Sequence, residues 1–139
     1  MIAPARSTLL QVISAIIPHP SPGSPSFLVG RRSPHKVSAP GYWCPVSGRI
    51  EPGETEIQAV VRECWEEVGL RVEPVRKVAE FPTHDETAII HWWLTRIVEG
   101  EAYLRNDEHT ELRWATAAEI AALEPVFAED AEVFRNLGL

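Results

Sequence analysis

Residues 55–69 constrain the fold most strongly, because this segment carries both the start and the stop signal of a helix. Thr55 and Gln58 have the spacing of a capping box, and Gly69 suits the left-handed conformation in which many helices end. At about 100° per residue the segment also carries an apolar stripe, which we expect to face a core. The stripe consists of Ile57, Val61, Cys64 and Val68.

Segments that favour β-strands lie on both sides of this helix. The expected strands are 7–17, 27–31, 42–46, 72–81, 87–96 and 112–114. Residues 18–25 contain four prolines, which exclude a strand or helix interior and indicate a hairpin loop. Thr116 and Glu119 predict a second capped helix over 117–123, and a third is expected at 129–137. This order predicts a single α/β domain, residues 1–139, with helices on the faces of a mixed sheet.

The net charge of −7 over 139 residues narrows the class of partner. An acidic protein repels a nucleic-acid backbone, so we expect no nucleic-acid polymer as a partner. The two cysteines are too few for a disulfide scaffold and indicate buried thiols in a reducing cytoplasm. No apolar run reaches the roughly 18 residues of a membrane-spanning helix, so we expect no membrane partner.

Three carboxylates crowd the predicted helix opposite its apolar stripe. Glu63, Glu66 and Glu67 have i, i+3 and i+4 spacing, the helix carries no Lys, and Arg62 is its only basic residue. One interpretation is a solvated acidic face. The other is a divalent-cation site, because Mg²⁺ and Mn²⁺ prefer hard oxygen ligands.

The turn before the helix extends this pattern. Residues 48–70 resemble the Nudix box at all seven of its fixed positions, and apolar residues stand at its two apolar positions, Cys64 and Leu70. The fixed positions are Gly48, Glu54, Arg62, Glu63, Glu66, Glu67 and Gly69. The resemblance implies the family fold, an α/β/α sandwich around a mixed β-sheet.

The resemblance also implies a chemistry. Nudix enzymes use Mg²⁺ or Mn²⁺ to hydrolyse a pyrophosphate bond in a nucleoside diphosphate linked to another group. By position, the implied metal ligands are Glu63, Glu66, Glu67 and the Ser47 carbonyl. Arg62 resembles the family's orienting arginine, paired with Glu54 or with a ligand carboxylate. The general base is then one of Glu63, Glu66 or Glu108.

Outside the box the chain is similar to MutT-type nucleoside triphosphate pyrophosphohydrolases. The expected substrate contacts are Arg31, Arg32, Arg49 and the segment beginning at Leu123. Leu123 is itself a departure, because the MutT-type asparagine at this position recognises an oxidised purine. The tryptophans at 43, 92 and 93 are expected in the core, with base stacking as the alternative. His109 is expected at the surface.

The resulting hypothesis is a Mg²⁺-dependent hydrolase of a small nucleotide, most simply a nucleoside triphosphate. We expect a monomer or a homodimer. A nucleotide-sugar (ADP-ribose-type) pyrophosphatase is the first alternative, and the short chain favours the triphosphate over it. A nucleotide-sensing module without turnover is the second alternative, and the complete set of box carboxylates argues against it.

Overall fold

The computed structural model describes residues 8–139, and within them the chain forms strands and helices in the expected order. The strands are β1 Leu10–Ile16, β2 Ser26–Arg32, β3 Trp43–Cys44, β4 Val46–Arg49, β5 Arg71–Pro82, β6 Ala88–Glu99 and β7 His109–Thr116. The helices are α1 Glu56–Val68, α2 Ala117–Ala122 and α3 Ala128–Arg135. Ser7, where the first strand was expected to begin, lies outside the described residues.

The strands form two sheets. One is mixed, with the order β4-β1-β6-β5 and with β1 parallel to β6; the other is antiparallel, with the order β3-β2-β7. The expected single strand over 42–46 is divided at Pro45 into β3 and β4, which belong to different sheets. A proline cannot donate a ladder hydrogen bond, so it suits the point where the chain changes sheets. This change brings β4 alongside β1.

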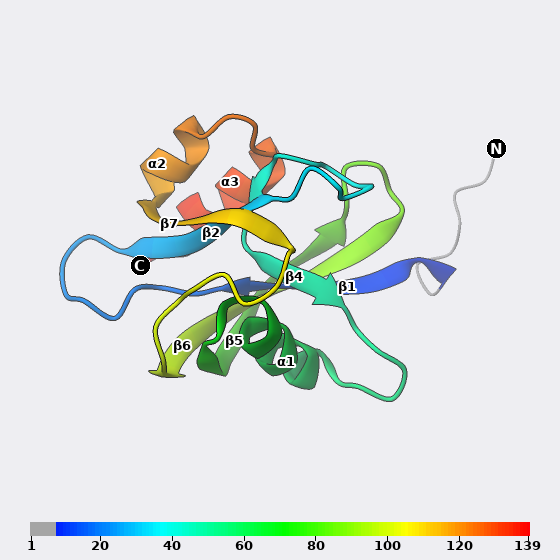
Figure 1. Cartoon of the computed structure of the whole chain (residues 1–139), viewed down its shortest axis with the longest axis horizontal. Coiled ribbons are helices and arrows are strands. Elements are labelled where there is room, and N and C mark those ends of the chain that lie inside the picture. The colour runs from blue at the N-terminus through cyan, green and yellow to red at the C-terminus, as the bar shows by residue number, and fades with distance from the viewer. Residues whose placement is uncertain (1–7) are drawn as a thin grey trace.

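Helices cover both faces of the strand layer, with α1 on one side and α2 and α3 on the other (Figure 1). The strand β1 packs against the helices on both sides, because its successive side chains point to opposite faces of the sheet. Ile13 packs in the cluster that contains Val60 and Cys64 of α1, whereas Ile16 packs in the cluster that contains Phe134 of α3. The α/β/α sandwich is therefore confirmed. Among the described residues, no helix is long and apolar enough to cross a membrane.

The ends of α1 are formed as its sequence predicts. The Gln58 amide donates to Thr55 Oγ1 at 3.1 Å, the Thr55 amide donates to Gln58 Oε1 at 2.9 Å, and Gly69 ends the helix at φ 69°. The second capping box, between Thr116 and Glu119, is formed in the same way.

The predicted apolar face of α1 is wrong in part. Ile57 and Val61 are 47% and 39% exposed, and Val60 takes their place in the core beside Cys64 and Val68. The helix carries two apolar stripes with i, i+4 spacing, and it packs the one that begins at Val60 against β1, β4 and β5.

Most of the remaining apolar expectations hold. Trp43 and Trp92 are buried in the hydrophobic cluster that contains Phe134, which we call the α3-side cluster. Their role is therefore core packing rather than base stacking. Trp93 is half-buried, and its indole Nε1 donates to Glu56 Oε1 at 2.9 Å. Cys44 and Cys64 are buried free thiols, as expected.

Candidate active site

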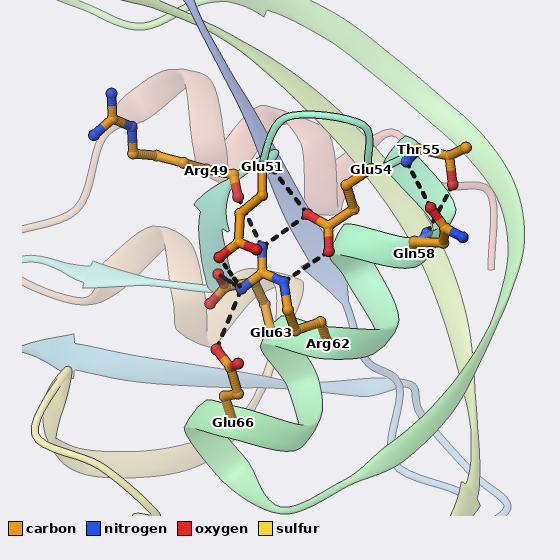
Figure 2. A network of polar contacts seen from close by, with 8 residues as sticks. All are labelled: Arg49, Glu51, Glu54, Thr55, Gln58, Arg62, Glu63 and Glu66. Atoms are coloured by element: carbon orange, nitrogen blue, oxygen red, sulfur yellow. Dashed lines mark hydrogen bonds and ion pairs between the residues drawn. The ribbon is translucent and has the colours of Figure 1, made fainter.

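Arg62 is the centre of a polar network that joins α1 to the turn before it (Figure 2). Its guanidinium donates to both carboxylate oxygens of Glu54, at 2.7 and 2.9 Å. It also donates to Glu63 at 2.6 Å, to Glu66 at 3.2 Å and to the Arg49 carbonyl at 2.9 Å. All five guanidinium N–H donors can thus be satisfied, which fixes the positions of three carboxylates at once.

The turn itself positions Glu54. The Glu54 amide donates to the Glu51 carbonyl, and the Glu51 amide donates to Glu54 Oε1, both at 3.0 Å. The hydrogen bond from Arg62 holds the pKa of Glu54 below its ordinary value, and Glu54 in turn raises the pKa of Arg62. Both groups therefore stay ionised across the physiological pH range.

Gly48 lets the turn and the helix approach each other closely. A Cβ atom at this position would lie 2.2 Å from Cδ of Glu63, which is closer than any tolerable contact. The Glu63 carboxylate can occupy its place over β4 only because the box motif has a glycine, without a Cβ, at position 48.

Glu67 differs from its neighbours because its side chain is only 2% exposed. Its Oε2 atom has no hydrogen-bond partner among the described residues. Burial, and next the adjacent Glu63 carboxylate, raise the pKa of Glu67 well above its ordinary value. The three carboxylates of α1 therefore do not share one solvated face: Glu67 is buried, Glu63 is mostly buried and Glu66 is about half exposed.

His109 lies behind Glu67, which corrects its expected place at the surface. The residue is buried, its Nδ1 is 3.7 Å from Glu67 Oε1, and its Nε2 is 4.0 Å from Cys44 Sγ. Burial, and next the charge of Arg32, lower its pKa to about 4. The ring fits because Gly30 has no side chain: a Cβ there would lie 2.5 Å from the His109 ring. An isolated glycine in a predicted strand is the one sequence signal of this close approach.

Glu108 is held by a lysine that sequence reasoning did not identify. Lys36 Nζ donates to Glu108 Oε2 at 2.5 Å, and both side chains are partly exposed. The two residues lie 72 positions apart in the sequence, so no local pattern predicts the pair.

One cavity of about 990 Å³ joins these groups. The predicted site residues that line it are Arg32, Ser47, Arg49, Arg62, Glu63, Glu66 and Glu108. Glu54 and Glu67 are not in the lining, but Glu54 accepts hydrogen bonds from Arg62, which is. Arg31 is not in the lining and donates to the Gly41 carbonyl at 3.2 Å, and Leu123 packs against the α3-side cluster. The Arg49 side chain points away from the network (Figure 2).

The α1 carboxylates present hard oxygen donors at one end of this cavity. Among residues 8–139, no three His, Cys, Asp or Glu side chains converge as a metal cluster. Arg62 contacts only one oxygen of Glu63 and one oxygen of Glu66, so the other oxygen of each carboxylate is not held by the guanidinium. The donor set still fits Mg²⁺ or Mn²⁺, and a cation would supply a partner for the orphaned Glu67 oxygen.

Comparisons with known proteins find relatives of this chain in sequence and in fold. The CTP pyrophosphohydrolase of Escherichia coli (strain K12) is 29% identical over 111 residues, 80% of this chain and 78% of that protein. The asymmetrical bis(5'-nucleosyl)-tetraphosphatase of Sus scrofa is 29% identical over 80 residues, 52% of this chain and 54% of that protein. A MutT protein structure from Methanosarcina mazei Go1 superposes with a TM-score of 0.77 at 23% identity, covering 91% of each chain.

The extent of these matches differs. The chain spans about a third to three fifths of the length of several curated relatives that it matches. The family model of the NUDIX domain, by contrast, matches residues 10–137, nearly the whole chain. The chain belongs to the NUDIX domain family.

Proposed function

We propose that this chain hydrolyses a pyrophosphate bond in a nucleoside diphosphate linked to another group, with Mg²⁺ or Mn²⁺ as cofactor and a nucleoside triphosphate as the first candidate substrate. The observation that carries the proposal is the Arg62 network, which places two ionisable carboxylates on a large cavity with the orphaned oxygen of Glu67 behind them.

The residues that would hold the cation are Glu63, Glu66 and Glu67, with the Ser47 carbonyl as a further oxygen. When bound, the metal supplies charge neutralisation for the substrate phosphates and alignment of the attacking water. Glu67 supports this assignment because a buried carboxylate oxygen without a hydrogen-bond partner is costly, and a cation bound to that oxygen would offset the cost.

The other residues of the cavity have roles that follow from their charge. Arg32 lines the cavity and is suited to contact a phosphate oxygen. Arg62 fixes the orientation of Glu63 and Glu66 before substrate arrives. A water molecule must lose its proton to attack phosphorus, and Glu63, Glu66 and Glu108 are the carboxylates in the lining that can accept it.

A nucleotide sugar of the ADP-ribose type is the second candidate. The cavity volume of about 990 Å³ favours it, because this value lies at the upper end of the range of roughly 300–1,000 Å³ for small-molecule sites. Such a volume leaves room for a group beyond the diphosphate.

The test is a substrate panel assayed with Mg²⁺ and with Mn²⁺. It contains nucleoside triphosphates, oxidised nucleotides, ADP-ribose and other nucleotide sugars. Release of pyrophosphate from triphosphates, with ADP-ribose left intact, supports the first candidate, and the opposite pattern supports the second. Glu111→Gln is a matched control, since Glu111 is exposed on β7 and lies outside the cavity lining. If no substrate is hydrolysed with either metal, the proposal is wrong.

A further inference from the structure

His109 is a buried histidine that the proposed chemistry does not use. Its Nδ1 lies 3.7 Å from Glu67 Oε1, and the two side chains are only 3% and 2% exposed. Among the described residues, three buried side-chain polar atoms lack a hydrogen-bond partner, and two of them are His109 Nδ1 and Glu67 Oε2. Because unpaired buried polar atoms are costly, two of them in one contact indicate an arrangement that is completed only when a ligand binds.

The His109 ring is held on several sides. His109 is the first residue of β7 and pairs with Arg32 of β2. The ring packs over Gly30, where a Cβ would lie 2.5 Å from the ring Cδ2. Its Nε2 lies 4.0 Å from the Sγ of Cys44, which is opposite Gly30 in the β2–β3 ladder. The ring thus has one nitrogen at a thiol and the other at the Glu67 carboxylate.

The Cys44 thiol favours the ring nitrogen that can donate to Glu67. Burial lowers the pKa of His109 to about 4, so the ring is neutral and carries one N–H. Burial also raises the pKa of Cys44 to about 12, so the thiol keeps its proton and can donate it to Nε2. The N–H of the ring is then on Nδ1. The opposite tautomer would place the Nδ1 lone pair against an ionised Glu67, which is repulsive.

Glu67 needs an orienting partner other than the one its neighbours use. Arg62 donates to Glu63 and to Glu66, but within residues 8–139 none of its hydrogen bonds or ion pairs reaches Glu67. Glu67 lies on the buried side of α1, and His109 approaches it from β7. Arg62 and His109 therefore contact different members of the same carboxylate set.

We propose that His109 is a positioning residue, whose Nδ1–H donates a hydrogen bond to Oε1 of ionised Glu67 and thereby directs Oε2 toward the cation. The inference rests on the proposed function, because Glu67 is one of the carboxylates that would hold the metal. The separation of 3.7 Å exceeds the range of about 2.7–3.2 Å for an N–H···O hydrogen bond, so a small rotation of the Glu67 side chain must accompany cation binding.

The experiment measures Mn²⁺ affinity by paramagnetic resonance for the wild type, His109→Asn, His109→Gln and His109→Phe. Asn carries an N–H donor at the distance of Nδ1 along the side chain, Gln carries one at the distance of Nε2, and Phe keeps a ring without a donor. We expect the affinity to fall about 10- to 100-fold in His109→Phe and His109→Gln. His109→Asn should retain an affinity close to that of the wild type.

A purely structural role for His109 predicts the opposite order. Phe fills the space of the ring, whereas Asn leaves a cavity, so Phe would then keep the Mn²⁺ affinity and Asn would lose it. Urea unfolding of each variant measures its stability separately. His19→Phe is the control and should leave the Mn²⁺ affinity unchanged, since His19 packs edge-on against Trp114 and lies outside the cavity lining.

A spectroscopic arm reports the hydrogen bond directly. Spectra of the protein labelled with ¹⁵N-histidine and saturated with Mg²⁺ show which ring nitrogen carries the proton, and the His109 signals are those absent from His109→Phe. We expect the proton on Nδ1. A proton on Nε2 overturns the inference whatever the affinities are, and this arm decides the matter if His109→Asn does not fold.

The outcomes separate this inference from the proposed function. Wild-type Mn²⁺ affinity in a folded His109→Phe protein overturns the inference while the proposed function stands. The expected order of affinities, together with the Nδ1 proton, supports the inference even if no substrate is hydrolysed. If the wild type binds no Mn²⁺, the metal assignment of the proposed function is wrong and this inference is wrong with it.

Discussion

Replacing Arg62 with Met removes the charge at the centre of the site while keeping a side chain of similar length. The variant leaves Glu54 and Glu63, each with a side chain only 13% exposed, without a cationic partner. Loss of one member of a buried ion pair costs about 3–5 kcal/mol, whereas the exposed contact to Glu66 adds only about 0.5 kcal/mol. Because the network faces an open cavity, we expect a loss near the lower end, about 3 kcal/mol in the free energy of unfolding.

The assay is urea unfolding followed by tryptophan fluorescence, with and without Mg²⁺. Arg135→Met is the matched control, because Arg135 pairs with Glu132 and both side chains are more than half exposed. That change should stay within about 0.5 kcal/mol. Mg²⁺ should restore part of the stability of Arg62→Met, since a cation can replace the lost charge. A loss under about 1 kcal/mol in Arg62→Met would refute the claim that Arg62 holds the site together.

Three further predictions follow from individual groups of the site. Because Arg62 lowers the pKa of Glu54, the ion pair stabilises the folded protein above pH about 4.5, and this stabilisation is lost as the pH falls. Glu54→Gln should therefore flatten the acid side of the curve of unfolding free energy against pH, measured by urea unfolding. In Gly48→Ala the new Cβ displaces the flexible Glu63 carboxylate, so the affinity for Mn²⁺, measured by paramagnetic resonance, should fall at least tenfold. The free energy of unfolding should change by less than about 1 kcal/mol. An unchanged Mn²⁺ affinity would contradict the placement of Glu63. Burial raises the pKa of Asp130 to about 7, because the folded protein favours the neutral carboxyl group. The folded protein should therefore be most stable with respect to this group below pH about 4 and should lose that stability as the pH rises to 7. Thermal melts of Asp130→Asn should lack this decline.

The boundaries of α1 are predictable because they depend on local chemistry. Thr55, Gln58 and Gly69 act on backbone groups within a few residues of themselves, and the structure forms the cap and the stop that they predict. The box motif identifies Gly48 and Glu63 without knowledge of the fold, whereas the close approach of these two residues is seen only in the structure.

The buried face of α1 is less predictable, because periodicity alone does not distinguish two stripes with the same spacing. Packing against β1, β4 and β5 selects the stripe that contains Val60 and Cys64, and this choice also buries Glu67. Simple amphipathicity disfavours a buried carboxylate, so the helix period alone does not predict the burial of Glu67.

The positions of His109 and Asp130 depend on contacts between segments that are distant in the sequence. His109 is buried because β7 pairs with β2 and because Gly30 leaves space for its ring. Asp130 is buried because α3 packs on a cluster that draws side chains from β1, β2 and β6. Neither the charge pattern nor the helix period of residues 128–135 carries this information.

Turnover by Glu67→Gln tests the central claim, that the α1 carboxylates hold a catalytic cation, most directly. Burial raises the pKa of Glu67, which favours the neutral carboxyl group in the metal-free protein, and a glutamine of the same shape should fold with nearly wild-type stability. Glutamine cannot ionise to bind a cation. We therefore predict that kcat with Mg²⁺ falls by several orders of magnitude while the urea midpoint stays close to that of the wild type. Wild-type turnover by a folded Glu67→Gln protein would contradict the account.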